Sequence, residues 1–464
     1  MKYICRCLLL FAIMFLLPAG ALADELMQDD FAKVSCGSAH TLALRHNGDL
    51  WAWGLNDRGQ VGNGGESDSL SQNQIPCQAK PVLVLDKVVS MAAGGTHSLA
   101  VKDDGSLWGW GMNYLGRLGF EGAERIVTPV KIMDDVLAVA AGEHFSLILK
   151  TDGSLWACGN NDLGQLGNGA PEETVQQPDD EPRPIEPQKI MEQVSAIAAG
   201  SSHALAVKED GSLWAWGLND FGQVGNGGAT DMYGTCQSLP ARIFESGVIS
   251  VAAGEKHSLA IMADGALWGW GDNSGQCLQE SDEEILTTPQ KLLDEIQFAC
   301  AASGRTLVIK EGGSLWGWGN NSYQAMDFNY KVDYVSPIPK KIMENVVNVS
   351  SGANHTMAVK VDGTLWGWGD NSCGQLGQAP GPLGLPVRVR VEYPAWPPEE
   401  EEEEEEAPAL QTEPEPEPKE TPQEPEYGSP LPFIIGCAVI AAGGVGAFII
   451  WRKKRKGMVS EWRK

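Results

Sequence analysis

One motif, repeated seven times, limits the possible folds of this chain more than any other feature of its sequence. In the second copy it reads Asp-Gly-Ser-Leu-Trp-Gly-Trp-Gly, from Asp104 to Gly111. Consecutive copies are separated by 48 to 58 residues. A repeat of this period indicates an array of similar units that bury their apolar faces against one another. The first glycine of the motif recurs as Gly48, Gly105, Gly153, Gly211, Gly265, Gly313 and Gly363.

Each unit is predicted to form four short strands. Residues 98–102 and 107–110 flank Asp104-Gly105, and Asp-Gly between two alternating runs is a strong signal for a β-hairpin. Patterns such as residues 129–132 and 139–142 supply the other two strands. Seven four-stranded antiparallel units predict an all-β, seven-bladed β-propeller over residues 24–393. A β-sandwich is the alternative, but it gives no reason for a count of similar four-stranded units.

The two ends of the repeat array predict how the ring closes. Residues 31–37 match the second strand pattern of the other units, so the first unit lacks an outer strand ahead of it. Residues 386–391 carry that missing pattern after the seventh unit. We therefore expect residues 386–391 to pair into the blade that begins at Phe31.

Two sets of polar residues recur with the motif and are interpreted as structural. An asparagine follows two residues after each Trp-Gly or Cys-Gly, where its side chain can bond to the backbone of the next turn. Five histidines stand eight residues before the hairpin glycine, while Phe145 and Arg305 take that position in the other two units. We expect buried histidines bonded to backbone rather than a shared metal site. The two sets are His40, His97, His203, His257 and His355, and Asn56, Asn113, Asn161, Asn219, Asn273, Asn321 and Asn371.

No motif in the repeats indicates catalysis or a cofactor. Thirteen of the 16 tryptophans occupy the two Leu-Trp-x-Trp positions, which predicts core residues rather than a platform for sugars. The Gly-Gln-Val/Leu-Gly segments lack the Lys-Ser/Thr and the helix that a phosphate site needs. We find no arrangement of the Ser-His-Asp kind, no carboxylate pair and no metal signature. We therefore expect a protein that is not an enzyme and has no cofactor.

The ends of the chain predict its location. Residues 1–23 have a basic start, an apolar run and Ala-Leu-Ala, as a secretory signal peptide does. Residues 433–451 are 19 uncharged residues, which as a helix would be about 28 Å long and would cross a bilayer once. The basic residues in 452–464 would then lie in the cytoplasm. We expect a single-pass protein of the cell membrane, with the propeller outside and the bilayer contacted through residues 433–451.

Charge and cysteine content add two constraints. Residues 394–430 hold 14 Glu and one Lys with many prolines, which predicts a disordered, extended stalk between propeller and membrane. The net charge is −27, and the acidic body disfavours binding to nucleic acid. Seven cysteines lie between residues 24 and 393. Because this number is odd, one cysteine at least has no partner within the chain, and the sequence does not assign the pairs.

The unit Val-x-x-Ala-Ala-Gly-x-x-His-Ser-Leu-Ala-Val-x-x-Asp-Gly-x-Leu-Trp-x-Trp-Gly-x-Asn-x-x-Gly-Gln-Leu-Gly resembles the regulator of chromosome condensation repeat over residues 31–392. The resemblance implies a seven-bladed propeller whose termini share a blade. Founding members are nuclear exchange factors for a small GTPase, and a secreted bacterial member inhibits a β-lactamase; both activities remain alternatives. Residues 275–278 and 323–326 depart from the motif, so distorted rims are expected in units five and six.

Three long insertions follow the tryptophan strands, at residues 65–80, 170–188 and 228–240. Ligand contacts on repeat scaffolds usually lie on such non-repeating loops, which here are expected on one side of the ring. We hypothesise that they bind an extracellular protein or a glycan, and that the propeller is monomeric. The candidate residues are Glu66, Asp68, Gln74, Glu172, Glu173, Asp179, Asp180, Arg183, Asp231, Met232 and Tyr233.

Overall fold

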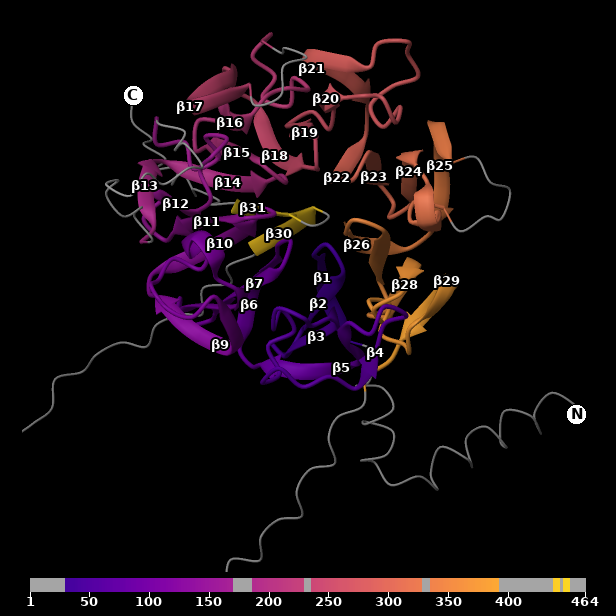
Figure 1. Ribbon diagram of the computed structural model, residues 1–464. Helices are drawn as coiled ribbons and strands as arrows, with labels where there is room; N and C mark the ends of the chain where they lie inside the picture. Colours follow the sequence, from indigo (N-terminus) through magenta and orange to yellow (C-terminus); the bar gives the residue numbers. More distant parts are fainter. Residues whose placement is uncertain are drawn as a thin grey trace, which may run out of the picture.

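Seven β-sheets are arranged in a ring around a central axis (Figure 1). The computed structural model describes residues 30–169, 186–228, 235–327, 334–391, 437–442 and 445–450. Each sheet of the ring has four antiparallel strands in chain order, and the first gains a short fifth strand. The predicted all-β, seven-bladed propeller is therefore confirmed.

The strands of each blade follow one another along the chain. Blades one and two contain β1 (Phe31–Cys36), β2 (His40–Arg45), β3 (Leu50–Leu55), β4 (Ser69–Leu70), β5 (Pro76–Leu85), β6 (Val88–Ala93), β7 (His97–Lys102), β8 (Leu107–Met112) and β9 (Arg125–Met133). Blades three and four contain β10 (Val136–Ala141), β11 (Phe145–Lys150), β12 (Leu155–Gly159), β13 (Gln188–Met191), β14 (Val194–Ala199), β15 (His203–Lys208), β16 (Leu213–Leu218) and β17 (Cys236–Phe244). Blades five to seven contain β18 (Val248–Ala253), β19 (His257–Met262), β20 (Leu267–Asp272), β21 (Ile285–Leu293), β22 (Ile296–Ala302), β23 (Arg305–Lys310), β24 (Leu315–Asn320), β25 (Val335–Met343), β26 (Val346–Ser351), β27 (His355–Lys360), β28 (Leu365–Asn371) and β29 (Gly381–Val389). Two single-turn 3-10 helices, η1 (Tyr114–Gly116) and η2 (Ser322–Gln324), follow β8 and β24.

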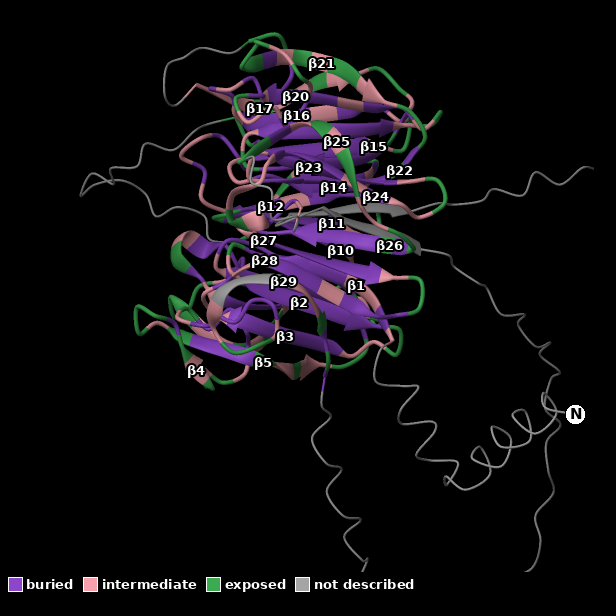
Figure 2. Cartoon of the chain, turned by 90° about the vertical axis from the view of Figure 1, so that its right-hand side faces the viewer, coloured by how far each residue is buried: buried purple, intermediate pink, exposed green. Residues whose placement is uncertain are grey.

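The core lies between neighbouring blades. Inner strands are rich in small residues, and in β10 four consecutive residues from Ala138 to Ala141 are fully buried. Small side chains fit there because the blades converge toward the axis. Outer strands such as β9 carry larger side chains, which are half-buried or exposed. Burial therefore falls from the interior toward the edge of the ring (Figure 2).

The second tryptophan of the motif joins its blade to the preceding blade through a hydrogen bond. Trp110 of blade two is fully buried, and its Nε1 donates to the Gln60 carbonyl of blade one at 2.9 Å. Gly62 must lack a side chain, because a Cβ atom there would lie 2.7 Å from the Trp110 Nε1. The ring of the other tryptophan, Trp108, is covered by Lys102, whose Nζ lies 5.3 Å from the ring centroid. Both tryptophan positions therefore serve packing within and between blades.

The expected sharing of one blade by both ends of the chain is wrong. Strand β29, which contains residues 386–389, pairs with β28 in blade seven, with Leu365 opposite Val389. The first blade is completed by its own strand β5, which pairs with β3. The reason is local, because each rim loop returns the chain directly onto the tryptophan strand that precedes it, and short connections between neighbours are preferred. Each blade therefore begins at its inner strand.

Side-chain contacts, rather than a shared sheet, join blade seven to blade one. The Val34 amide donates to Asn348 Oδ1 at 2.9 Å, and the Cys36 amide donates to Ser350 Oγ at 2.9 Å. Trp53 Nε1 donates to the Gln375 carbonyl at 2.9 Å. The ring is thus closed by contacts between blades that are far apart in sequence.

The apolar segment near the C-terminus forms strands where a helix was predicted. Residues Cys437–Ala442 (β30) and Val445–Ile450 (β31) pair antiparallel within the ring of blades (Figure 1). The segment is rich in Val and Ile, which favour strands, and the sequence has Gly443-Gly444 between them. Within the described ranges, no helix is long and apolar enough to cross a membrane. The predicted signal peptide, stalk and basic tail lie outside the described residues.

Strand direction gives the ring two different faces. One, the rim-loop face, carries the turns between inner and second strands and the loops that follow each Trp-Gly or Cys-Gly. The other, the hairpin face, carries the seven glycine hairpins. Both ends of the propeller lie on the hairpin face, because the Phe31 amide donates to the Gly363 carbonyl at 3.0 Å and β29 runs toward the same hairpin.

Candidate functional site on the rim-loop face

The asparagines hold the rim loops from inside. Asn113 Oδ1 accepts a bond from the Leu118 amide at 3.1 Å, and its Nδ2 donates to the Phe120 carbonyl at 3.0 Å. In every blade the asparagine accepts a bond from the amide five residues later. These seven asparagine side chains fix the conformation of the loops, and their carboxamide groups are engaged in hydrogen bonds to the loop backbone.

The histidines bridge neighbouring blades beneath the same face. His40 Nε2 lies 3.0 Å from Ser98 Oγ in the next blade, and Ser98 Oγ donates to the Gln60 carbonyl at 2.8 Å. The expected partner was backbone, whereas the direct partner is a hydroxyl group. Burial lowers the pKa of His40 to about 3, so the imidazole is neutral. The same bridge joins His97 to Ser146, His203 to Ser258, His257 to Thr306 and His355 to Thr41.

Blade six replaces the histidine by Arg305, which is buried beside the axis. Its guanidinium donates to Ser351 Oγ at 3.0 Å, to the Gly352 carbonyl at 2.8 Å and to the Ala353 carbonyl. Burial lowers the pKa of Arg305 to about 10, which leaves it charged at neutral pH. A buried positive charge therefore lies under the central turns at the contact between blades six and seven.

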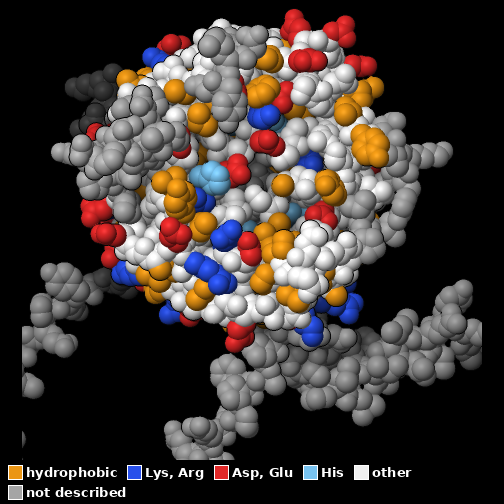
Figure 3. All heavy atoms as spheres, viewed as in Figure 1, with side chains coloured by type: hydrophobic (Ala, Val, Ile, Leu, Met, Phe, Trp, Pro, Cys, Tyr) orange, Lys and Arg blue, Asp and Glu red, His pale blue; other side chains and the backbone are white. Residues whose placement is uncertain are grey.

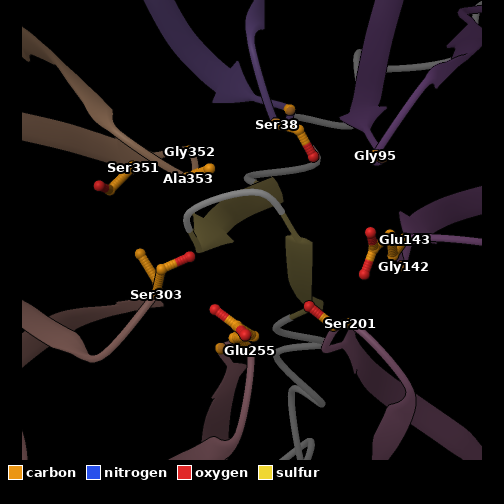
Figure 4. A pocket seen from close by; sticks show the side chains of 14 residues that line it. Ser38, Gly95, Gly142, Glu143, Ser201, Glu255, Ser303, Ser351, Gly352 and Ala353 are labelled. Atoms are coloured by element: carbon orange, nitrogen blue, oxygen red, sulfur yellow. The ribbon is translucent and has the colours of Figure 1, made fainter. Parts of the chain in front are cut away.

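A polar cavity of about 230 Å³ opens at the centre of the rim-loop face. The turns of all seven blades line it, and the two carboxylates of Glu143 and Glu255 alternate with the hydroxyl groups of Ser38, Ser201 and Ser303 (Figure 4). Its walls offer acceptors and negative charge. Such a lining suits a group that is positively charged or donates hydrogen bonds.

A second cavity of about 350 Å³ lies between blades five and six. Its lining includes Lys256, Asp272, Asn320 and Tyr334, so both signs of charge and an aromatic ring meet there. The cavity coincides with the two units that depart from the repeat. In unit five the glycine motif is displaced by one residue, and Gln276 adopts a positive φ of 51°. The loop keeps its length, and Gln276 takes the left-handed position that Gly59 occupies in unit one.

Apolar side chains are exposed around this second cavity. Tyr334 is 72% exposed, Tyr323 is 50% exposed and Ile285 is 36% exposed. Figure 3 shows the rim-loop face, where hydrophobic, acidic and basic side chains surround a hollow centre. Exposed aromatic groups that neighbour a mixed-charge cavity are typical of surfaces that bind other molecules.

The loops chosen from sequence lie only partly within the described residues. Residues 65–80 are described and form a folded loop in which Glu66, Asp68 and Gln74 lie, the last with a positive φ of 60°. The Asp68 carboxylate accepts bonds from the amides of Ala79 at 2.6 Å and Lys80 at 2.9 Å, so it shapes the loop. The candidates that lie outside the described residues are Glu172, Glu173, Asp179, Asp180, Arg183, Asp231, Met232 and Tyr233.

Sequence reasoning did not select the residues of the second cavity. Lys256 lies in a turn whose length is kept in every unit and Asp272 ends strand β20, so nothing in their local pattern marks them. The displaced motif of unit five and Tyr323 in unit six were the signals that could have found the site. They were interpreted only as distortions of the rim.

Comparisons with known proteins agree with this architecture. The chain is 30% identical over 249 residues to the "Ultraviolet-B receptor UVR8" of Arabidopsis thaliana, covering 52% of this chain and 41% of the receptor. It is 28% identical over 254 residues to the human "E3 ubiquitin-protein ligase HERC2", covering 54% of this chain and 4% of the ligase. The chain thus spans less than half of the length of these curated relatives.

Solved structures share the fold. Human WBSCR16 superposes with a TM-score of 0.62 at 24% identity, covering 74% of this chain and 94% of that one. Prp20p of Saccharomyces cerevisiae gives a TM-score of 0.61 at 24% identity, covering 72% and 84%. The sequence profile of the RCC1-like domain matches residues 18–305, and that of the regulator of chromosome condensation (RCC1) repeat matches residues 312–359 and 346–375. The chain therefore belongs to the family of RCC1-like domain proteins.

Proposed function

We propose that the chain is a non-enzymatic binding protein tethered to the cell membrane, whose rim-loop face recognises another protein outside the cell. One observation carries the proposal. Both described ends of the propeller lie on the hairpin face, opposite the two cavities. A tether that leaves the hairpin face turns the rim-loop face away from the bilayer and toward partners.

The tether itself is inferred from the sequence. Residues 394–430 would reach ~115 Å as an extended Glu/Pro stalk. Residues 433–451 would then enter the membrane as a helix, because a helix bonds all of its backbone groups within one segment and the bilayer interior offers them no water. The hairpin of β30 and β31 is the arrangement that competes with this insertion.

The chemistry of the second cavity favours a polypeptide partner. Lys256 and Asp272 offer a cation and a carboxylate, and Tyr334 offers a large exposed ring. Aromatic anchors are enriched at the centres of protein interfaces, and polar and charged groups surround them at the rim. Prp20p, which has this fold, has been studied for its binding to Gsp1p and histones, both of which are proteins.

Location is tested by protease treatment of intact cells, followed with one antibody to the propeller and another to residues 452–464. We expect the propeller to be shed and the tail to remain inside. Membranes washed with alkaline carbonate should retain the tail fragment, because a helix across the bilayer resists extraction. A protected propeller would refute the extracellular location and make regulation of a cytoplasmic GTPase the leading function.

Recognition is tested by placing a photo-crosslinking amino acid at Tyr334 in the full chain on cells. The matched control is Val361 on the hairpin face, since the two residues are 72% and 69% exposed. We expect a discrete protein adduct from position 334 and none from position 361. Lys256→Glu should lower the yield of that adduct about tenfold. Equal labelling from both positions would show that the rim-loop face is not the binding surface. If the only adduct contained a glycan, the partner would be a glycan and not a protein.

A further inference from the structure

Two cysteines meet at the contact, or seam, that closes the ring. Cys77 lies in β5 of blade one, and Cys373 lies in the rim loop of blade seven. Their side chains lie next to each other and interact. The loop packs directly on the strand, because a Cβ atom at Gly374 would lie 2.7 Å from the Ala79 Cα. Residues 296 positions apart are thus in side-chain contact.

The repeats allow this seam to be compared with others in the same chain. A glycine of the rim loop touches the outer strand of the next blade in the same way at Gly59 with Val127, at Gly164 with Ser238 and at Gly222 with Thr287. The positions equivalent to Cys373 and Cys77 hold Arg58 with Arg125, Leu163 with Cys236, and Phe221 with Ile285. Of these four seams, the closing one alone has a cysteine on each side.

The closing seam is also where a covalent link would stabilise the fold most. Other neighbouring blades follow one another through short connections, as β5 leads to β6 across two residues. Blades seven and one share no strand, so only side-chain and backbone contacts keep them together. A bond between residues 77 and 373 would close a loop that contains almost the whole propeller, and longer loops restrict the unfolded chain more.

We propose that Cys77 and Cys373 form a disulfide bond that closes the propeller covalently. The structure shows both residues as free thiols. Formation of the bond removes two protons and two electrons, which a small disulfide such as oxidised glutathione, or a thiol–disulfide oxidoreductase, accepts. The Cys373 thiolate attacks the oxidant's disulfide and releases one thiol. The Cys77 thiolate then displaces the second thiol and forms the Cys77–Cys373 bond.

The surroundings of the pair favour this order of steps. Interaction with the Cys77 side chain lowers the pKa of Cys373 to about 7, and the same interaction raises the pKa of Cys77. Cys373 is also partly exposed, so an oxidant can reach it. Burial instead raises the pKa of the Cys158 thiol to about 12, which keeps that thiol unreactive. An exterior location, as proposed above, would supply oxidising conditions.

The test uses the purified full chain, incubated with oxidised glutathione or with dithiothreitol, then alkylated, digested and analysed by mass spectrometry. We expect one cross-linked pair of peptides, containing Cys77 and Cys373 and lighter by two hydrogen atoms than the separate peptides. The Tm of the oxidised chain should exceed that of the reduced chain by about 3–5 °C. The half-buried Cys236, whose neighbour across its seam is Leu163, should still be a free thiol after oxidation and should be recovered in alkylated form.

Two variants complete the test. Cys373→Ser should abolish both the cross-linked peptides and the Tm difference, whereas Cys236→Ser should leave both unchanged. Recovery of Cys77 and Cys373 as separately alkylated peptides after oxidation, or linked to other cysteines, would overturn the proposal. The mass spectrum of the unaltered chain decides the question even if a variant does not fold. Because no cells are involved, failure here leaves the proposed location untouched.

Discussion

Lowering the pH from 7 to 5 is expected to destabilise the propeller by about 2 kcal/mol for each of four buried histidines, His40, His203, His257 and His355, and His97 acts in the same direction. In the folded protein, burial lowers the pKa of His40, His203 and His355 to about 3 and that of His257 to about 4, and the pKa of His97 falls well below 6.5. The unfolded chain therefore binds protons below pH 6.5 while the folded chain does not. Stability is full above this pH and is lost as the pH falls toward the folded-state pKa values.

The window between pH 7 and pH 5 isolates the histidines. Hydrogen bonds from Ser106 and Ser154 lower the pKa of Asp104 and Asp152 below the ordinary aspartate value of 3.8. Stability that depends on these carboxylates is present above that value and is lost only at more acidic pH. Carboxylates of this kind thus contribute little to the change between pH 7 and pH 5.

Urea unfolding at pH 7, 6 and 5 measures the effect. Phe145 already takes the place of the histidine in blade three, so His203→Phe is the matched variant, and it should reduce the pH dependence by about one fifth. The exposed His46 supplies the control, because His46→Gln removes an imidazole that is not buried and should change the dependence less than His203→Phe does. A folding free energy that is equal at pH 7 and pH 5 would contradict neutral, buried imidazoles.

Gly200→Ala is expected to destabilise the fold by about 3 kcal/mol. A Cβ atom at this position would lie 2.3 Å from His203 Cε1 and 2.5 Å from the Gly254 carbonyl oxygen of the next blade. Gly200 is not among the glycines with a positive φ, so the cost comes from overpacking between blades. Thermal and urea unfolding of the purified variant measure the loss.

Blade six supplies the control for this substitution. Ala302 stands where the other blades have glycine, and Arg305 stands where five of them have histidine, so no imidazole ring occupies the space beside it. Ala302→Gly should therefore change the stability by less than ~1 kcal/mol. Equal losses for Gly200→Ala and Ala302→Gly would show that the imidazole does not decide the need for glycine.

Much of the fold could be predicted because each repeat carries its own local signals. Asp104-Gly105 and Trp108-Gly-Trp110 predict a hairpin and a buried strand without knowledge of any other blade, and seven copies predict seven blades. The blade boundary could not be predicted in this way. Residues 386–391 have the same extended pattern whether they join β28 or the strand that begins at Phe31, and pairing between strands leaves no mark in one strand alone.

The sites depend on contacts that no local pattern records. Ser98 has the sequence context of an ordinary strand residue, yet its hydroxyl group is hydrogen-bonded to His40 of the preceding blade. Lys256 comes from a turn, Asp272 from the end of β20 and Tyr334 from the residue before β25, and they line one cavity only because blades five and six lie side by side.

The amino-acid sequence alone determined that the chain builds seven similar antiparallel units, since hydrophobic period and turn residues act within a few positions of each other. Tertiary structure decided which strands share a blade, which face is opposite the chain ends, and that Cys77 meets Cys373 across the closing seam. Closure of the ring brings together residues hundreds of positions apart. Their proximity follows from the geometry of the whole ring, and a repeat that is the same in every unit cannot encode it.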